Sequence, residues 1–184
     1  MWTEKYERDF IESELKRSVS EVNQAEKLRF VADCHLGKLA RHLRFGGFDT
    51  LYDPRAEDGE LLALARREGR LLLTRDRELA VRAGSDALLL RSVRLEEQLA
   101  ELARALPLAE RFAPFTRCMV CNTPLRAIAR EEACSRVPPR VCESFDAFRY
   151  CPGCGRIYWR GDHYEAMMRR WKRLPESEKV FPDG

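Results

Sequence analysis

The sequence predicts an α/β fold in which a central parallel sheet carries helices on its faces. Between residues 27 and 110, short apolar segments alternate with amphipathic ones, and this alternation is typical of parallel sheets. The segment 70–74 is apolar through its centre, as expected for a strand that is buried on both faces. Beyond residue 110 the composition changes, and two Cys-x-x-Cys pairs indicate a separate metal-binding part.

The first strand is predicted at residues 28–32 and is followed directly by Asp33. In the helix after it, apolar residues recur from Leu36 at i, i+3, i+4 and i+7, which puts them on one face. The Gly-Gly pair at 46–47 is typical of a left-handed helix end. Residues 48–52 then form the second short strand.

The second helix is predicted at residues 58–69, where Asp58 can cap the start and Gly69 can end the helix. The last helix, 95–106, repeats leucines at helical spacing and is closed by Pro107. The elements between these two helices complete the alternation with a strand at 70–74, a helix at 78–83 and a strand at 87–90.

The chain has 184 residues and a net charge of +3, and its composition changes along its length. Residues 111–184 carry 12 Arg and 2 Lys against 9 acids, a mildly basic balance that suits nucleic acid. No apolar run approaches the roughly 20 residues of a membrane span, and the charged start lacks the apolar block of a secretory signal. We therefore expect a cytoplasmic protein with no membrane partner. The expected segments are a polar N-terminal extension at 1–26, the α/β core at 27–110, a cysteine-bearing module with a closing helix at 111–173, and a tail at 174–184.

Four of the seven cysteines form two Cys-x-x-Cys pairs, Cys118 with Cys121 and Cys151 with Cys154. Each pair spaces two thiolates for one metal ion, and two pairs complete a closed tetrahedral zinc site that holds a fold rather than performing chemistry. The sequence therefore predicts a structural zinc ribbon. Buried thiols are the simplest interpretation of the other cysteines in a chain without a signal peptide; these are Cys34, Cys134 and Cys142.

Three aspartates lie where the predicted topology brings them to one edge of the sheet. Asp33 ends the first strand, Asp76 follows the third strand, and Asp58 opens the helix between them. Functional side chains in this fold class gather beyond the carboxyl ends of the strands, and clustered carboxylates need a cation to remain ionised together. Hard oxygen ligands with open positions suit Mg²⁺ or Mn²⁺, which activate water toward a phosphodiester. The sequence thus predicts all three as catalytic acids, with Asp33 and Asp76 as the Mg²⁺ or Mn²⁺ ligands.

Structural roles compete with this interpretation. An aspartate after a strand is commonly a helix N-cap, and Asp58 alone is well explained in that way. Glu60 and Glu78 are further acids that either lie in an outer shell of the site or are charges on a helix surface. Three basic residues on the helix after Asp33 either contact phosphate or form a solvated face, namely Lys38, Arg41 and Arg44. The residues that could contact a phosphate are Lys38, Arg41 and Arg75.

These motifs, in this order, resemble the Mut-seven C-terminal RNase domain family. The resemblance rests on Asp33 with the run 36–50, on 58–62, on 69–79, and on 151–163, which reads CPGCGRIYWRGDH. It covers residues 27–173 and implies a PIN-like nuclease core with an appended zinc ribbon, and a divalent-metal-dependent ribonuclease activity with RNA as the partner. Asp33 and Asp76 match the family's metal-binding aspartates, Asp58 is carried over with them, and Glu60 is a further candidate.

The function predicted from these residues is metal-assisted hydrolysis of RNA. Asp33 and Asp76 would hold the cation, and Asp58 would orient the cation or water. One alternative is a non-catalytic module that binds RNA or a protein through the zinc ribbon, on a degenerate PIN-like core. A second is a phosphoacceptor receiver domain, which is disfavoured because Cys34 stands where that class has a second acid and Arg91 stands where it has a lysine.

Overall fold

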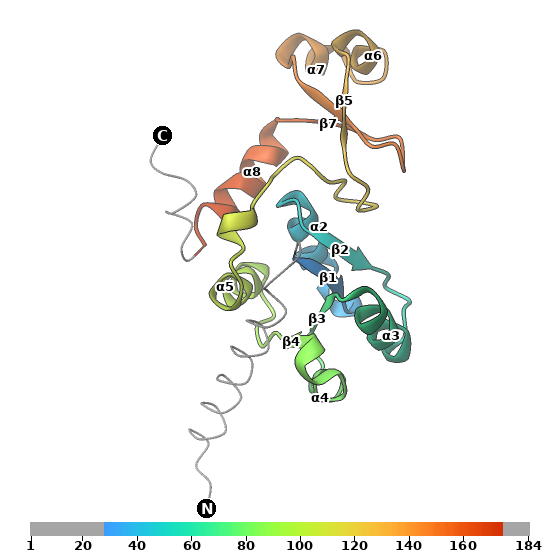
Figure 1. The fold of residues 1–184 in the computed structure, drawn as a ribbon. Helices are drawn as coiled ribbons and strands as arrows, with labels where there is room; N and C mark the ends of the chain where they lie inside the picture. Colours follow the sequence, from blue (N-terminus) through green and yellow to red (C-terminus); the bar gives the residue numbers. More distant parts are fainter. Residues whose placement is uncertain (1–27, 175–184) are drawn as a thin grey trace, which may run out of the picture.

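A four-stranded parallel sheet lies at the centre of the computed structural model, which describes residues 28–174 (Figure 1). Its strands lie in the order β2-β1-β3-β4, and all three pairings are parallel. Their bounds are Arg29–Ala32 for β1, Asp49–Tyr52 for β2, Leu71–Thr74 for β3 and Ala87–Leu89 for β4. The predicted α/β class with a central parallel sheet is confirmed. The extension predicted at 1–26 lies outside the described residues, as does the tail after residue 174.

Helices cover both faces of this sheet, as the alternating sequence predicts. They are α2 (Gly37–Phe45), α3 (Asp58–Glu68), α4 (Arg77–Ala83) and α5 (Leu95–Ala105), with short 3-10 turns η1 at Cys34–Leu36 and η2 at Gly84–Asp86. Phe30 and Leu73 are fully buried against α2 and α5. Val31 and Leu72, which alternate with them along the strands, are fully buried against α3 and α4. Because neighbouring strand residues point to opposite faces, both faces of the sheet are apolar, and this explains the continuous apolar run in β3.

The cysteine-bearing segment forms a second, antiparallel sheet, which lies above the core in Figure 1. It has the order β5-β6-β7, with β5 at Arg126–Ile128, β6 at Phe148–Tyr150 and β7 at Ile157–Trp159. Two short helices, α6 (Arg130–Cys134) and α7 (Pro139–Ser144), connect β5 to β6. The turn η3 (Ala109–Arg111) precedes this cysteine module.

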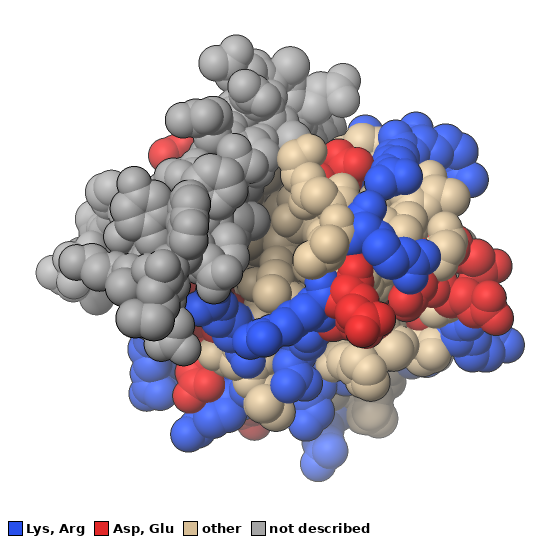
Figure 2. Space-filling model, turned by 90° about the horizontal axis from the view of Figure 1, so that it is seen from below, with Lys and Arg blue, Asp and Glu red and all other residues tan. Residues whose placement is uncertain are grey.

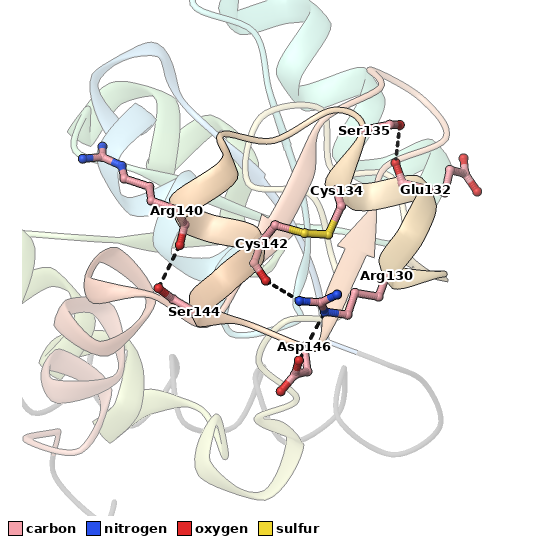
Figure 3. The surroundings of a disulfide bond; sticks show 8 residues. All are labelled: Arg130, Glu132, Cys134, Ser135, Arg140, Cys142, Ser144 and Asp146. Atoms are coloured by element: carbon pink, nitrogen blue, oxygen red, sulfur yellow. Dashed lines mark hydrogen bonds and ion pairs between the residues drawn. A yellow bond between two sulfur atoms is a disulfide. The ribbon is translucent and has the colours of Figure 1, made fainter.

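A disulfide joins α6 to α7 through Cys134 and Cys142 (Figure 3). Their Cα atoms are 5.4 Å apart, within the usual range for a bridged pair. The expectation of two separate buried thiols is therefore wrong. Sequence spacing did not indicate the pairing, because the two residues meet only once α6 and α7 pack against each other. Arg130 adds a second link, since its guanidinium donates to the Cys142 carbonyl at 2.6 Å and pairs with Asp146 at 3.2 Å.

The closing helix α8 (Asp162–Trp171) returns from the cysteine module to the core. Met167 and Trp171 are almost fully buried in the same apolar cluster as Phe30 and the faces of α2 and α5. The Trp171 ring stacks on Phe48, with centroids 5.9 Å apart and planes at 21°. The last described helix therefore completes the core that the first strands begin. No helix among residues 28–174 has the length and apolar character to cross a membrane.

Polar contacts fasten the cysteine module to β2, the edge strand of the central sheet. The Thr50 amide donates to Asn122 Oδ1 at 3.1 Å, and the Thr50 carbonyl accepts from Arg44 Nε at 2.8 Å. Arg44 is 6% exposed and also donates to the Val120 carbonyl at 2.7 Å. Both backbone groups of Thr50 are thus paired, and the module covers an edge that would otherwise offer unpaired groups to another chain. Arg44 is a structural residue here and does not belong to a solvated face.

Replacing Arg44 with Ala is expected to destabilise the protein by about 3 kcal/mol. The substitution leaves the buried carbonyl of Thr50 and the part-buried carbonyl of Val120 without their donor, and an unpaired buried group costs about 1–3 kcal/mol. Urea unfolding measures the change. The control is Arg41→Ala on the exposed side of the same helix, and equal losses for the two variants would contradict the assignment.

Acid is expected to weaken the same junction through Asp49. Burial alone would raise the pKa of Asp49, but hydrogen bonds from Arg70 and Asn122 and the charge of Arg117 outweigh burial and hold the pKa below 3.8. Because the unfolded chain binds the proton more tightly, this stabilisation is complete above about pH 4 and is lost as the pH falls through the folded pKa. Thermal unfolding between about pH 5 and pH 3 should show a shallower loss for Asp49→Asn than for wild type, and equal slopes would refute this.

Candidate functional site

Asp33 lies buried at the carboxyl end of β1. It is 4% exposed, and its Oδ2 accepts a hydrogen bond of 2.8 Å from the Thr74 hydroxyl. Burial alone would raise the pKa of Asp33, but hydrogen bonds from the Cys34 thiol and Thr74, together with the charge of His35, outweigh burial and lower the pKa below 3.8. The position therefore holds an ionised carboxylate in a buried pocket of polar donors.

Thr74 ties Asp33 to the loop that carries Asp76. The Thr74 hydroxyl donates to Asp33 and accepts from the Asp76 amide at 2.9 Å. Asp76 also caps α4, because its Oδ1 accepts from the amides of Glu78 at 2.7 Å and Leu79 at 3.0 Å. Its Oδ2 has no hydrogen-bond partner within residues 28–174. The capping role and a ligand role can therefore coexist on the two oxygens of one carboxylate.

Asp58 and Glu60 are occupied by contacts at the start of α3. Asp58 Oδ2 pairs with Arg82 at 3.1 Å, and both side chains are about half exposed. Glu57 occupies the N-cap position in a capping box with Glu60, whose carboxylate accepts from the Glu57 amide at 2.9 Å. The prediction that Asp58 caps this helix is therefore wrong by one residue. Glu78 is exposed in the first turn of α4.

Two residues that follow Asp33 enter the site. Ligand atoms of Asp33, Cys34 and His35 all lie within 4.8 Å of one another, so these three could hold a metal ion. Among the described residues, Asp33, Asp58 and Asp76 do not form such a group. The negative charge of Asp58 nonetheless acts on Cys34 at this edge of the sheet. Hydrogen bonding to Asp33, burial, and the charges of Asp33 and Asp58 together raise the pKa of Cys34 above 9.0.

The basic residues predicted to contact phosphate differ in their surroundings. Lys38 and Arg41 are exposed on α2. The Nε atom of Arg75 is buried and has no hydrogen-bond partner among the described residues, although Arg75 stands between Thr74 and Asp76. Figure 2, seen from below the view of Figure 1, shows basic and acidic side chains interspersed on that face, which agrees with the small net charge.

The four cysteines of the module form a second cluster. The sulfur atoms of Cys118 and Cys154 are 3.6 Å apart, those of Cys121 and Cys151 are 3.3 Å apart, and all four lie within 4.8 Å of one another. Burial and contacts with neighbouring sulfurs raise the pKa of Cys151 to about 12, so a dication must displace its proton to bind. The predicted four-cysteine group is confirmed as one that could hold a structural metal such as zinc.

The two turns that carry these cysteines have the same backbone form. Asn122 follows the first pair with φ 68°, and Gly155 follows the second with φ 74°. Their amides donate to the carbonyls of Cys118 and Cys151, both at 2.9 Å. Asn and Gly are the residues that adopt this left-handed conformation at least cost. Asn122 then uses its side chain to hold β2, so one residue shapes the metal turn and docks it to the core.

The fold and its two clusters define an α/β protein with acidic groups at the carboxyl edge of a parallel sheet and an attached cysteine module. A family model described as Mut7-C RNAse domain matches residues 28–171, and the chain belongs to this family. The resemblance seen in the sequence motifs is confirmed, and the family suggests a nuclease-type function acting on RNA. No curated protein matches the chain. No solved structure matches it either.

Proposed function

We propose that the protein is a divalent-metal-dependent ribonuclease with a PIN-like core, whose reaction takes place at the carboxyl edge of the central sheet. The observation that carries the proposal is the linkage of Asp33 through Thr74 to the Asp76 loop. It ties a buried carboxylate, held ionised, to the loop that carries a second carboxylate with one unpartnered oxygen. The family match over residues 28–171 supports RNA as the substrate.

The donor set at this edge fits Mg²⁺ or Mn²⁺. These cations take oxygen ligands and keep several waters, so one or two carboxylates are enough to bind them. Asp33 and Asp76 supply those carboxylates, while Asp58 is paired with Arg82 and acts from farther away through its charge. A cation bound there would neutralise charge on the phosphodiester and lower the pKa of a bound water.

The remaining roles belong to donors around the two aspartates. The Thr74 hydroxyl fixes the orientation of Asp33, since Oδ2 is held at 2.8 Å and turned toward β3. Arg75, part-buried between Thr74 and Asp76, would contact a phosphate oxygen, and Lys38, exposed on the first turn of α2, would contact the neighbouring phosphate. These contacts would position the substrate, and the negative charges of Asp33 and Asp76 would attract the cation.

We further propose zinc as the metal of the four-cysteine cluster and a zinc ribbon as the cysteine module. Four thiolates without an open position form a closed site. The cluster lies beside the polar junction with β2, because Asn122 follows Cys121 in the first cysteine turn and its side chain accepts from the Thr50 amide. Zinc would therefore stabilise the module and keep it attached to the core.

Incubation with RNA and DNA of the same sequence, with and without Mn²⁺, tests the proposed activity. We expect RNA to be cleaved only when the divalent cation is present, and DNA to be cleaved more slowly or not at all. Zinc-loaded, folded protein that binds RNA but leaves it intact at every Mn²⁺ and Mg²⁺ concentration would refute the nuclease and leave a non-catalytic binding module.

A further inference from the structure

A cavity of about 690 Å³ lies between the core and the cysteine module, apart from the proposed catalytic edge. Its walls come from α2, the segment around the first cysteine turn, α7, and the connection from β7 into α8. None of Asp33, Asp58 and Asp76 lines it. Its volume falls within the range of small-molecule sites, and a nucleobase with its ribose is smaller than this.

Aromatic rings dominate the walls of this junction cavity. Tyr164 is the central one, because its ring centroid lies 5.4 Å from that of Phe45 and 5.5 Å from that of Phe115. The Arg160 guanidinium lies over Phe115 and Tyr164, at 5.8 and 5.6 Å from their centroids. Three further aromatic residues line the cavity, namely Phe145, Tyr158 and Trp159. Such rings, with a stacked guanidinium, offer flat apolar surfaces of the kind that bind unstacked bases.

The charged groups at this cavity favour an anion. Arg41, Arg117 and Arg140 line it, against the single acid Asp162. Arg117 is engaged with Asp49 at 3.5 Å. Arg41 and Arg140 are exposed, and neither has an ion-pair partner within the described residues. In Figure 3 the Arg140 side chain extends away from the disulfide on the other side of α7.

We propose that the junction cavity binds an unpaired nucleobase of single-stranded RNA, with Arg41 and Arg140 contacting the flanking phosphates. An aromatic pocket with arginines at its mouth matches a base attached to a charged backbone better than it matches an apolar peptide. Arg41 lies three residues after Lys38, on the same side of α2, because residues at i and i+3 of a helix are neighbours. The strand would thus follow α2 from the proposed catalytic edge to the cavity. The inference rests on the proposed function, since it assigns a binding pocket for the same substrate.

Binding of a fluorescent single-stranded oligoribonucleotide of about 12 nucleotides tests this assignment by anisotropy. The protein is used zinc-loaded and without added Mg²⁺ or Mn²⁺, so that cleavage does not intervene. Arg140→Glu reverses a charge at the mouth, and Ser144→Trp fills the cavity from the last turn of α7. Arg126→Glu is the matched control, because Arg126 is exposed on β5 and does not line the cavity. Zinc content and circular dichroism confirm that each variant is folded.

We expect Arg140→Glu and Ser144→Trp each to weaken binding about tenfold or more, and Arg126→Glu to change it by less than about twofold. A chain of the same length with abasic riboses, and a duplex of the same sequence, should bind wild type more weakly. Equal losses for Arg126→Glu and Arg140→Glu, or equal affinity for the abasic chain, would overturn the pocket in favour of a surface that only follows phosphates. Failure of folded wild type to bind the oligonucleotide would also overturn it.

The two proposals fail separately in this design. If binding follows the expected pattern but no RNA is cleaved when Mn²⁺ is added, the nuclease proposal fails and the base pocket stands. If RNA is cleaved but the two cavity variants bind and cleave it like wild type, the base pocket fails and the nuclease stands.

Discussion

Replacing Asp33 with Asn should abolish RNA cleavage while the protein stays folded and zinc-loaded. Asn removes the charge of a buried carboxylate, and its amide oxygen can still accept the hydrogen bond that Thr74 donates at 2.8 Å. We expect the cleavage rate in Mn²⁺ to fall by more than about 100-fold, because loss of a metal ligand lowers activity at least as much as loss of a residue that hydrogen-bonds to a ligand. The thermal unfolding temperature without divalent cations should fall only modestly, because Asn loses the charge that the hydrogen bonds favour over burial but still accepts from Thr74.

Asp76→Asn separates capping from catalysis. Asn caps a helix nearly as well as Asp, so the contacts to the amides of Glu78 and Leu79 should survive. A cap alone therefore predicts full activity, whereas a ligand predicts a loss similar to that of Asp33→Asn. Asp86→Asn is the control, because Asp86 pairs with Arg66 at the start of β4, at the opposite edge of the sheet. Full activity in both Asp33→Asn and Asp76→Asn would refute the metal site.

Loss of one cluster cysteine is the second change with a large expected effect. Cys151 is fully buried at the four-cysteine cluster, and Cys151→Ser should reduce the zinc content from about one ion per chain to near zero. The free energy of binding structural zinc, about 10–16 kcal/mol in small zinc modules, is largely folding free energy. The cysteine module should therefore unfold, and the signal of the antiparallel sheet should be lost.

Cys142→Ser provides the control for this result. It removes the disulfide with Cys134 but leaves the four-cysteine cluster intact, so it should keep its zinc and lose only about 2 kcal/mol of stability, as expected for a short closed loop. Elemental analysis and urea unfolding measure the two effects. Wild-type protein that is fully folded without any bound metal would contradict the structural role of the cluster.

The parts of the molecule that sequence predicts well are those with local signals. The four strands and four helices of the core follow from the alternation of apolar periods, and the cysteine turns follow from the spacing of Cys118 with Cys121 and of Cys151 with Cys154. The position of Asp33 at the end of β1 was predicted because it follows a buried strand, and its role in the site stays a prediction. Each of these features is encoded within one short window of residues.

The parts that were missed depend on residues that are far apart in the chain. Arg44 and Asn122 hold the cysteine module to β2 although they are 78 positions apart in the chain, and nothing beside Arg44 in sequence marks it as buried. The disulfide partners meet only through the packing of α6 on α7. The capping box at Glu57 was missed because Ser, Thr, Asp and Asn dominate N-caps, and Asp58 stands one residue later.

Titration of zinc-loaded protein with Mn²⁺, followed by electron paramagnetic resonance in the absence of RNA, tests most directly whether the carboxyl edge of the sheet binds a catalytic cation. The account predicts saturable binding to wild type and a loss of affinity of about tenfold or more in both Asp33→Asn and Asp76→Asn, with no change in Asp86→Asn. Equal Mn²⁺ affinity in wild type and in the two site variants would contradict the proposed metal site, because the cation would then bind elsewhere.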